Sequence, residues 1–191
     1  MQATSSKLLF LRQFLTKPLN IGAIVPSSKR LAQLMVTNLS WQPDDYVVEI
    51  GPGTGVFTRE LLAQGVPSNK IILVEFNSDF VKFLRREFPN VKVIEGDAKL
   101  LPRLLEKLGI GKVKRIVSGI PMRSLSCAMA ASITSAIAAS LETNGVAVQF
   151  TYATMPPLAK SEAAAGGLIG SRATWVLRNV PPAVIWRYVK V

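Results

Sequence analysis

A glycine-rich segment near residue 50 carries the clearest chemical signal in the sequence. Gly51, Gly53 and Gly55 alternate directly after a short apolar run, and Glu49 stands two residues before the first of them. Glycines in such a turn let the backbone approach a ligand closely, and a helix that begins behind the turn offers free N–H groups. A dinucleotide-binding turn would instead show the spacing G-x-G-x-x-G. The segment therefore predicts a different nucleotide-like ligand.

Two further acidic residues follow at the ends of predicted strands. Glu75 ends one apolar run, where its carboxylate can accept hydrogen bonds from both ribose hydroxyls. Asp97 follows the next apolar run, where it can accept a hydrogen bond from an adenine amino group. Parallel sheets bind ligands at the carboxyl ends of their strands. Together with the glycine spacing, this is the pattern of S-adenosylmethionine-dependent methyltransferases. The predicted cofactor-binding residues are Glu49, Gly51, Gly53, Thr54, Gly55, Glu75, Phe76, Asp97, Ala98 and Ser118.

The segment 118–122, with the sequence Ser-Gly-Ile-Pro-Met, follows a fourth predicted strand and bears on the methyl acceptor. Many amine methyltransferases carry Asn or Asp here, then Pro and an aromatic residue whose ring stacks on a base. Because Met122 replaces that ring, a nucleobase acceptor loses its stacking platform. A flexible alkyl amine needs only hydrogen-bond acceptors and room for the methyl donor. A plain strand-to-helix turn is the alternative interpretation.

The composition excludes several kinds of chemistry. The chain has 191 residues, 49% of them hydrophobic, and a mean hydropathy of +0.30, which excludes a disordered chain. It contains no histidine, so Ser-His-Asp and Cys-His machinery and histidine metal ligands are absent. The single cysteine, Cys127, excludes an intramolecular disulfide and a multi-cysteine zinc site. We therefore predict no metal.

Apolar runs alternate with helical patterns along most of the chain. Strands are predicted at 46–50, 70–74, 91–94, 115–118 and 146–151, with helices between them, including one over 124–141. This alternation predicts a parallel sheet with helices on both faces. After residue 151 the pattern changes to a loop over 155–171 and an antiparallel pair at 173–179 and 183–189. The predicted fold class is α/β, a Rossmann-like class I methyltransferase fold whose mostly parallel seven-stranded sheet has an antiparallel C-terminal edge.

The net charge of +11 is concentrated at the two ends of the chain. Residues 1–43 and 163–191 contain basic residues and no acidic residue. Two acid-free basic ends on a nearly neutral body favour an anionic partner, either lipid headgroups or nucleic acid. A contribution to solubility alone is the alternative explanation.

The segment 5–17 has the pattern of a basic amphipathic helix. Such a helix can lie in the headgroup region of a bilayer, although docking on the core of the domain is an equal alternative. The N-terminus does not have the order of a signal peptide, and the uncharged run 124–141 has one apolar stripe, so we predict no transmembrane helix. The predicted membrane-contacting residues are Lys7, Phe10, Leu11, Arg12, Phe14 and Lys17.

Five segments of the sequence carry a family resemblance: Gly22–Ser28, Glu49–Gly55, Ser118–Pro121, Gln149–Tyr152 and Arg178–Tyr188. Through them, and over nearly its whole length, the chain resembles the short, soluble bacterial phospholipid N-methyltransferases, which convert phosphatidylethanolamine towards phosphatidylcholine. The resemblance implies a peripheral enzyme on the cytoplasmic face of the bacterial inner membrane, bound to anionic lipid by its N-terminal helix. It also implies a division of the chain into a helical segment, 1–40, for membrane contact and active-site closure, and a methyltransferase domain, 41–191.

The reaction implied is in-line displacement of the sulfonium methyl group by the headgroup nitrogen, which leaves S-adenosylhomocysteine. Tyr152, with Ser118 and Pro121, is expected to orient the amine, and the ring of Tyr152 can also face a cationic headgroup. Packing at a strand end is the alternative role for Tyr152. The predicted substrate-binding residues are Pro26, Ser27, Ser28, Gly119, Ile120 and Tyr152.

Three other functions compete with this one. Related enzymes methylate ornithine lipids, and the sequence does not separate the two lipid substrates. Ribosomal RNA adenine dimethyltransferases share the glycine loop, but segment 118–122 replaces their Asn-Leu-Pro-Tyr element and no C-terminal helical domain for RNA is present, so a nucleic-acid partner is disfavoured. A non-catalytic lipid-binding module would not need the intact glycine loop and three acids.

Overall fold

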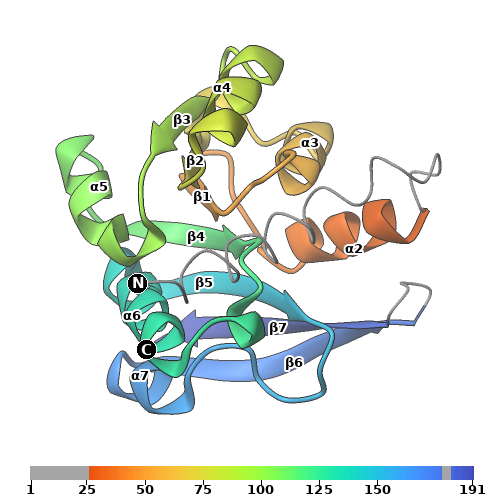
Figure 1. The fold of residues 1–191 in the computed structure, drawn as a ribbon, viewed down its shortest axis with the longest axis vertical. Helices are drawn as coiled ribbons and strands as arrows, with labels where there is room; N and C mark the ends of the chain where they lie inside the picture. The colour runs from red at the N-terminus through yellow and green to blue at the C-terminus, as the bar shows by residue number, and fades with distance from the viewer. Residues whose placement is uncertain (1–25, 178–181) are drawn as a thin grey trace, which may run out of the picture.

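The computed structural model describes residues 26–177 and 182–191, and only the backbone of residues 26–28. Seven strands form a single sheet in the order β3-β2-β1-β4-β5-β7-β6 (Figure 1). The first five are parallel, β7 is antiparallel to β5, and β6 is antiparallel to β7 at the edge. Their bounds are β1 Val47–Ile50, β2 Ile71–Glu75, β3 Lys92–Glu95, β4 Val113–Ser118, β5 Leu141–Thr151, β6 Leu168–Val176 and β7 Ala183–Lys190.

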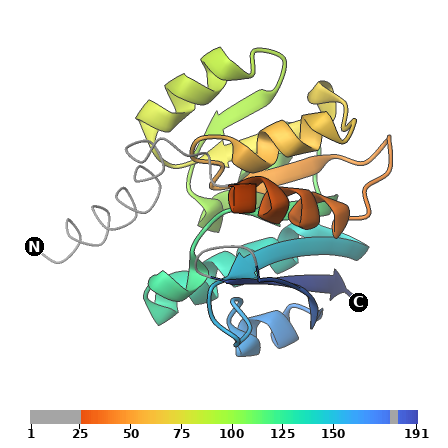
Figure 2. The same ribbon diagram turned by 90° about the vertical axis from the view of Figure 1, so that its right-hand side faces the viewer.

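Helices cover both faces of this sheet, as Figures 1 and 2 show. On one face α2 (Pro26–Thr37), α3 (Val56–Ala63) and α4 (Ser78–Glu87) share an apolar core with β1, β2 and β5. On the other face α5 (Leu101–Lys107), α6 (Cys127–Ser140) and α7 (Lys160–Ala165) form a second core. Strands β1 and β2 are buried at every residue, which is why they are continuous apolar runs in the sequence. Short 3₁₀ helices lie at Ser68–Lys70, Ala98–Leu100 and Met122–Ser124.

The predicted fold class is confirmed, but the start of β5, the loop 155–171 and the buried side of α6 differ from the prediction. Strand β5 begins at Leu141, ahead of the predicted start at residue 146, and it contains Asn144 with a φ of 64° where the register to β4 shifts. The predicted loop 155–171 contains α7 and the first residues of β6. Within α6, Met129 is exposed, because the buried side of that helix is made by Ile133, Ile137 and small residues instead.

The N-terminal predictions fall partly outside the described residues. Lys7, Phe10, Leu11, Arg12, Phe14 and Lys17 all lie in the segment that the structure does not describe. Helix α2, by contrast, packs in the domain core through Leu31, Met35 and Val36. Within residues 26–177 and 182–191, no helix has both the length and the hydropathy needed to cross a bilayer.

Candidate active site

Backbone hydrogen bonds join the loops at the carboxyl ends of the parallel strands. The amide of Gly51 donates to the carbonyl of Val74, and the amide of Gly119 donates to that of Ile50, each at 2.9 Å. The amide of Gly96 donates to the carbonyl of Glu75 at the same distance. The loops that follow β1, β3 and β4 are therefore fixed side by side at one edge, where the sequence places its acids.

The glycine loop has a backbone conformation that few other residues adopt. Gly51, Gly53 and Gly55 have φ angles of 67°, 55° and 76°, in the left-handed region where glycine carries no steric penalty. Gly55 is the N-cap of α3, and no side chain caps that helix. The first N–H groups of α3 are thus left without a side-chain acceptor, which suits an anionic ligand group at this turn.

Glu49 is a fully buried carboxyl group at the end of β1. Its Oε2 accepts a hydrogen bond of 2.6 Å from the Thr58 hydroxyl on α3, whereas its Oε1 has no partner. Burial raises the pKa of Glu49 to about 8, the Thr58 hydrogen bond lowers it, and the nearby Glu75 charge raises it. A buried oxygen without a partner is costly, so this geometry fits a ligand that supplies a donor or a positive charge.

Glu75 is the last residue of β2, and Asp97 lies two residues after the end of β3. Glu75 is almost buried, and its two oxygens accept hydrogen bonds from the amides of Gly53 at 3.1 Å and Asn77 at 2.9 Å. Each carboxylate oxygen can accept a second hydrogen bond, so the group can still receive hydroxyls. Asp97 accepts from the amide of Lys99 and pairs with its ammonium at 3.2 Å. Next to these acids, Phe76 is 63% exposed and Ala98 is buried.

The segment 118–122 already uses several of its carbonyl groups. The Ile120 carbonyl accepts from the Met122 amide and from Gln149 Nε2, both at 2.8 Å. The Pro121 carbonyl accepts from Ser124. The Ser118 hydroxyl oxygen, which receives the Ile120 amide at 3.3 Å, and the Pro121 carbonyl can each accept one further hydrogen bond. The Gly119 carbonyl accepts no backbone hydrogen bond from the residues that the structure describes.

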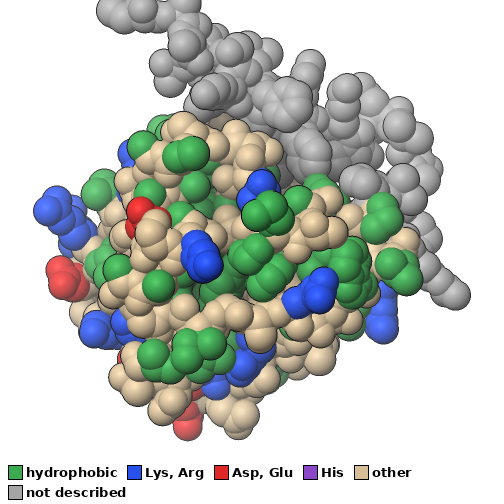
Figure 3. Space-filling view, turned by 90° about the horizontal axis from the view of Figure 1, so that it is seen from below, with side chains coloured by type: hydrophobic (Ala, Val, Ile, Leu, Met, Phe, Trp, Pro, Cys, Tyr) green, Lys and Arg blue, Asp and Glu red, His purple; other side chains and the backbone are tan. Residues whose placement is uncertain are grey.

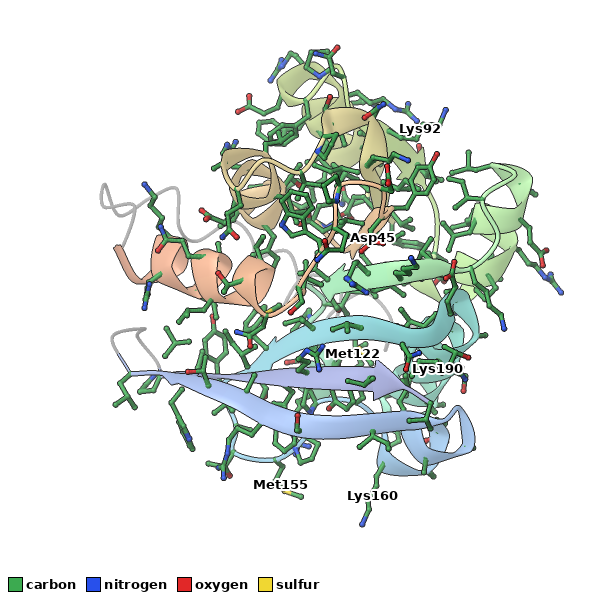
Figure 4. The ribbon with its side chains drawn as sticks, turned by 180° about the vertical axis from the view of Figure 1, so that it is seen from behind. Asp45, Lys92, Met122, Met155, Lys160 and Lys190 are labelled. Atoms are coloured by element: carbon green, nitrogen blue, oxygen red, sulfur yellow. The ribbon has the colours of Figure 1, made fainter. Side chains whose placement is uncertain are left out.

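The burial of Met122 and the role of Gln149 at this site were not predicted from the sequence. Met122 is only 2% exposed and packs in the apolar core (labelled in Figure 4), so it does not face the site as the expected stacking ring would. Gln149 was not among the predicted site residues, yet it is buried and ties β5 to segment 118–122. A polar residue in the otherwise apolar run of β5 was the available sequence signal.

Aromatic contacts link Tyr152 to helix α3, which follows the glycine loop. Its ring lies edge-on to that of Phe150 with centroids 5.5 Å apart, and Phe150 lies edge-on to Phe57 of α3 at 5.9 Å. Tyr152 is 40% exposed. The structure thus brings Tyr152 to the α3 side of the sheet edge. Pro26, Ser27 and Ser28 form the first turn of α2, and their side chains lie outside the described part.

The residues at this edge fit S-adenosylmethionine, the predicted cofactor. Glu49 offers an unpartnered buried oxygen, and Glu75 and Asp97 offer carboxylates for hydroxyl and amino groups. The edge is also tightly built, because a Cβ placed on Gly119 would lie 2.5 Å from the carbonyl oxygen of Gly51. In the part of the chain that the structure describes, no three His, Cys, Asp or Glu side chains are grouped as metal ligands.

Solved structures of other methyltransferases share this fold. Magnesium protoporphyrin IX methyltransferase from Synechocystis, determined with bound S-adenosylmethionine, superposes with a TM-score of 0.72 over 97% of each chain at 12% identity. TrmN from Thermus thermophilus superposes with a TM-score of 0.67, covering 88% of this chain and 52% of that one at 15% identity. At these identities the likeness establishes the fold alone.

Sequence relatives fall into two groups. An ornithine lipid N-methyltransferase from Singulisphaera acidiphila is 35% identical over 119 residues, which are 61% of this chain and 62% of that protein. A ribosomal RNA small subunit methyltransferase A from Chlorobium chlorochromatii is 40% identical over 80 residues, 42% of this chain and 29% of that protein. The matched regions therefore span less than two thirds of either relative.

One family model covers most of the chain and includes the whole glycine loop and all the strand-end acids. It matches residues 10–150 and describes ribosomal RNA adenine dimethylases. These residues hold β1 to β4, nearly all of β5, and every predicted cofactor-binding residue. The chain belongs to the ribosomal RNA adenine dimethylase family of methyltransferases.

Proposed function

We propose that the protein transfers methyl groups from S-adenosylmethionine to the amine of a membrane lipid, with ornithine lipid as the favoured acceptor. The observation that carries this proposal is the 35% identity to an ornithine lipid N-methyltransferase, which extends over 62% of that protein. The cofactor prediction is confirmed, because the chain belongs to a methylating family and neighbours of the same fold hold S-adenosylmethionine. The sequence favoured phosphatidylethanolamine first and ornithine lipid as the alternative, and the relatives support the alternative better.

RNA is the competing acceptor, because family and relatives both include ribosomal RNA methyltransferases. Those matches cover only about a third of each relative, for example 29% and 36%. Segment 118–122 also contains no aromatic residue on which a base could stack, and Met122, at the position of the expected ring, is buried. These two observations favour a lipid amine over a nucleobase.

The chain's own residues have the task of orienting and desolvating an amine. When bound, the cofactor supplies an electrophilic methyl group on its sulfonium. The Ser118 hydroxyl and the Gly119 carbonyl can fix the direction of the attacking nitrogen, which must arrive as the free amine. The ring of Tyr152 packs edge-on against Phe150 and the residue is 40% exposed, so we assign Tyr152 a place beside that path. Because the chain has no histidine, catalysis of this kind depends mainly on positioning.

The proposed working location is the surface of a membrane, on its cytoplasmic face. The basic amphipathic pattern over residues 5–17 supports this location, as does the absence of acidic residues from 1–43. Lys7, Phe10, Leu11, Arg12, Phe14 and Lys17 remain the proposed lipid-contacting residues of that segment.

A labelling experiment tests the proposed acceptor. The full chain is incubated with S-adenosylmethionine labelled in its methyl group and with vesicles that contain ornithine lipid, vesicles that contain phosphatidylethanolamine, or ribosomal RNA. We expect label in ornithine lipid, and the Tyr152→Phe variant to lower turnover about 10- to 100-fold if the hydroxyl orients the amine. Label confined to the RNA would overturn the proposal, and label in phosphatidylethanolamine alone would restore the first sequence prediction.

A further inference from the structure

A groove of about 430 Å³ lies between α2 and the end of β6. Arg30 and Leu34 of α2 form one wall, and Thr174, Trp175, Val176 and Leu177 form the other. We call these six residues the hairpin groove. None of these residues belongs to the segment 5–17 that the sequence analysis singled out.

The hairpin groove exposes large apolar side chains to water. Leu177 is 73% exposed and Trp175 is 43% exposed, whereas Val176 between them is buried. Contiguous apolar surface of this kind on a folded domain marks a contact surface. Figure 3, which shows the molecule from below relative to Figure 1, shows hydrophobic side chains with Lys and Arg between them on the face turned to the viewer.

Cationic groups border the same groove. The Arg172 guanidinium lies over the Trp175 ring at 5.5 Å from its centroid, and Arg30 is exposed on the opposite wall. Within residues 26–177 and 182–191, neither arginine forms an ion pair, and the sequence has no acidic residue from 163 to 191. An apolar surface bordered by unpaired arginines matches the chemistry of an anionic bilayer, in which apolar chains lie beneath phosphate groups.

The groove lies at the same edge of the sheet as the candidate active site. Val184 of β7 is paired with Thr151 at the end of β5 on one side and with Trp175 of β6 on the other. Strand β5 ends at this edge, next to Tyr152. A membrane that touches Trp175 and Leu177 would therefore face the edge where the acceptor loop and Tyr152 lie.

We propose that the hairpin groove docks on the surface of an anionic bilayer, with Trp175 and Leu177 at the boundary of headgroups and acyl chains and Arg30 and Arg172 beside lipid phosphates. The inference rests on the proposed function, because it assigns a route by which a lipid headgroup reaches the site. Trp is favoured at such interfaces since one end of its ring is apolar and the other donates a hydrogen bond. An RNA partner would gain nothing from Leu177, which has neither charge nor ring.

Tryptophan fluorescence gives a readout specific to this surface, because residues 1–25 contain no tryptophan. The full chain is titrated with vesicles of phosphatidylethanolamine and phosphatidylglycerol whose acyl chains carry bromine, which quenches tryptophan on contact. We expect quenching that is largely lost in the Trp175→Phe variant, since Trp41 and Trp186 are partly buried. Quenching that is unchanged in Trp175→Phe would overturn the proposal.

A matched pair of variants separates the groove from the rest of the hairpin. Leu177→Asp places a charge in the groove just after β6, where Leu177 is 73% exposed. Ile169→Asp places a charge at the opposite end of β6, where Ile169 is 61% exposed. We expect Leu177→Asp to weaken vesicle binding about tenfold and Arg172→Gln about fivefold, with Ile169→Asp unchanged. Equal effects of both aspartate variants would contradict the proposal.

The remaining outcomes identify other occupants. If Leu177→Asp converts an oligomer to a monomer in sedimentation without vesicles, the groove joins copies of this chain and the proposal is wrong. If ribosomal RNA shields Trp175 and vesicles do not, the groove binds RNA and the proposal is also wrong. Methylated lipid without Trp175 quenching would reject the groove and keep the proposed function. Quenching of Trp175 without methylated lipid would keep the groove as a membrane contact and reject the proposed function.

Discussion

Glu49 combines complete burial with an unsatisfied oxygen at the centre of the candidate site. Its neighbours Thr58 and Glu75 act in opposite directions on its pKa, and burial outweighs the Thr58 hydrogen bond, so the pKa stands at about 8. At neutral pH the carboxyl group is therefore mostly protonated. A positively charged ligand beside it would favour the ionised form, so binding and ionisation are linked at this residue.

The raised pKa of Glu49 predicts how stability changes with pH. The folded state holds this proton more tightly than the unfolded chain, whose value is near 4.5. The contribution of Glu49 to stability is thus fully present below about pH 4.5 and is lost as the pH rises through about 8. Urea unfolding across that range should show the free energy of unfolding of the Glu49→Gln variant falling less steeply than that of the original chain. Parallel curves for the two proteins would contradict the assignment.

The loops that follow strands β1 and β4 are in close contact at Gly51 and Gly119. A Cβ on Gly119 would lie 2.5 Å from the carbonyl oxygen of Gly51, and backbone atoms cannot move aside as a flexible side chain does. We expect Gly119→Ala to lower the free energy of unfolding by about 1–3 kcal/mol and to weaken S-adenosylmethionine binding, as measured by denaturation and calorimetry.

The control for that variant is Gly109→Ala. Gly109 has open space around its Cβ position and a φ of 70°, so alanine there introduces backbone strain without a clash. Its cost should be about 1 kcal/mol with no effect on cofactor binding. Equal loss of cofactor binding in both variants would show that general destabilisation, and not the contact of β1 with β4, explains the effect.

The elements that sequence analysis predicted well are those with a simple burial pattern. Strands β1 and β2 are buried on both faces and are mainly apolar, so their positions, and those of Glu49 and Glu75 near their carboxyl ends, followed from the sequence. The first half of β6 was missed because Ile169 to Ala173 are exposed at the edge of the sheet and show no alternation. Gln149 was missed because its role depends on the Ile120 carbonyl, 29 residues away in the chain.

At the scale of the whole molecule, the charge distribution predicts salt-sensitive membrane binding. Raising the ionic strength from about 0.1 M to about 1 M shortens the Debye length from about 10 Å to about 3 Å. Binding to anionic vesicles should fall steeply over this range, while binding to phosphatidylcholine vesicles should stay weak throughout. Co-sedimentation measures both, and salt-independent binding to anionic vesicles would show that the basic ends, with no acid in 1–43 or 163–191, are not used for attraction.

The strand order has a consequence for how the protein folds during its synthesis. Strand β7 lies between β5 and β6, although it is the last of the three in the chain (Figure 1). When the ribosome has made β6, its partner strand β7 is not yet available, and β6 cannot take its final place until residues 183–190 have emerged. The parallel core from β1 to β5 can form first, and the hairpin then adds as a unit. Pausing of translation between residues 176 and 183 would leave β5 as an open edge, the stage at which a nascent chain is most exposed to mispairing.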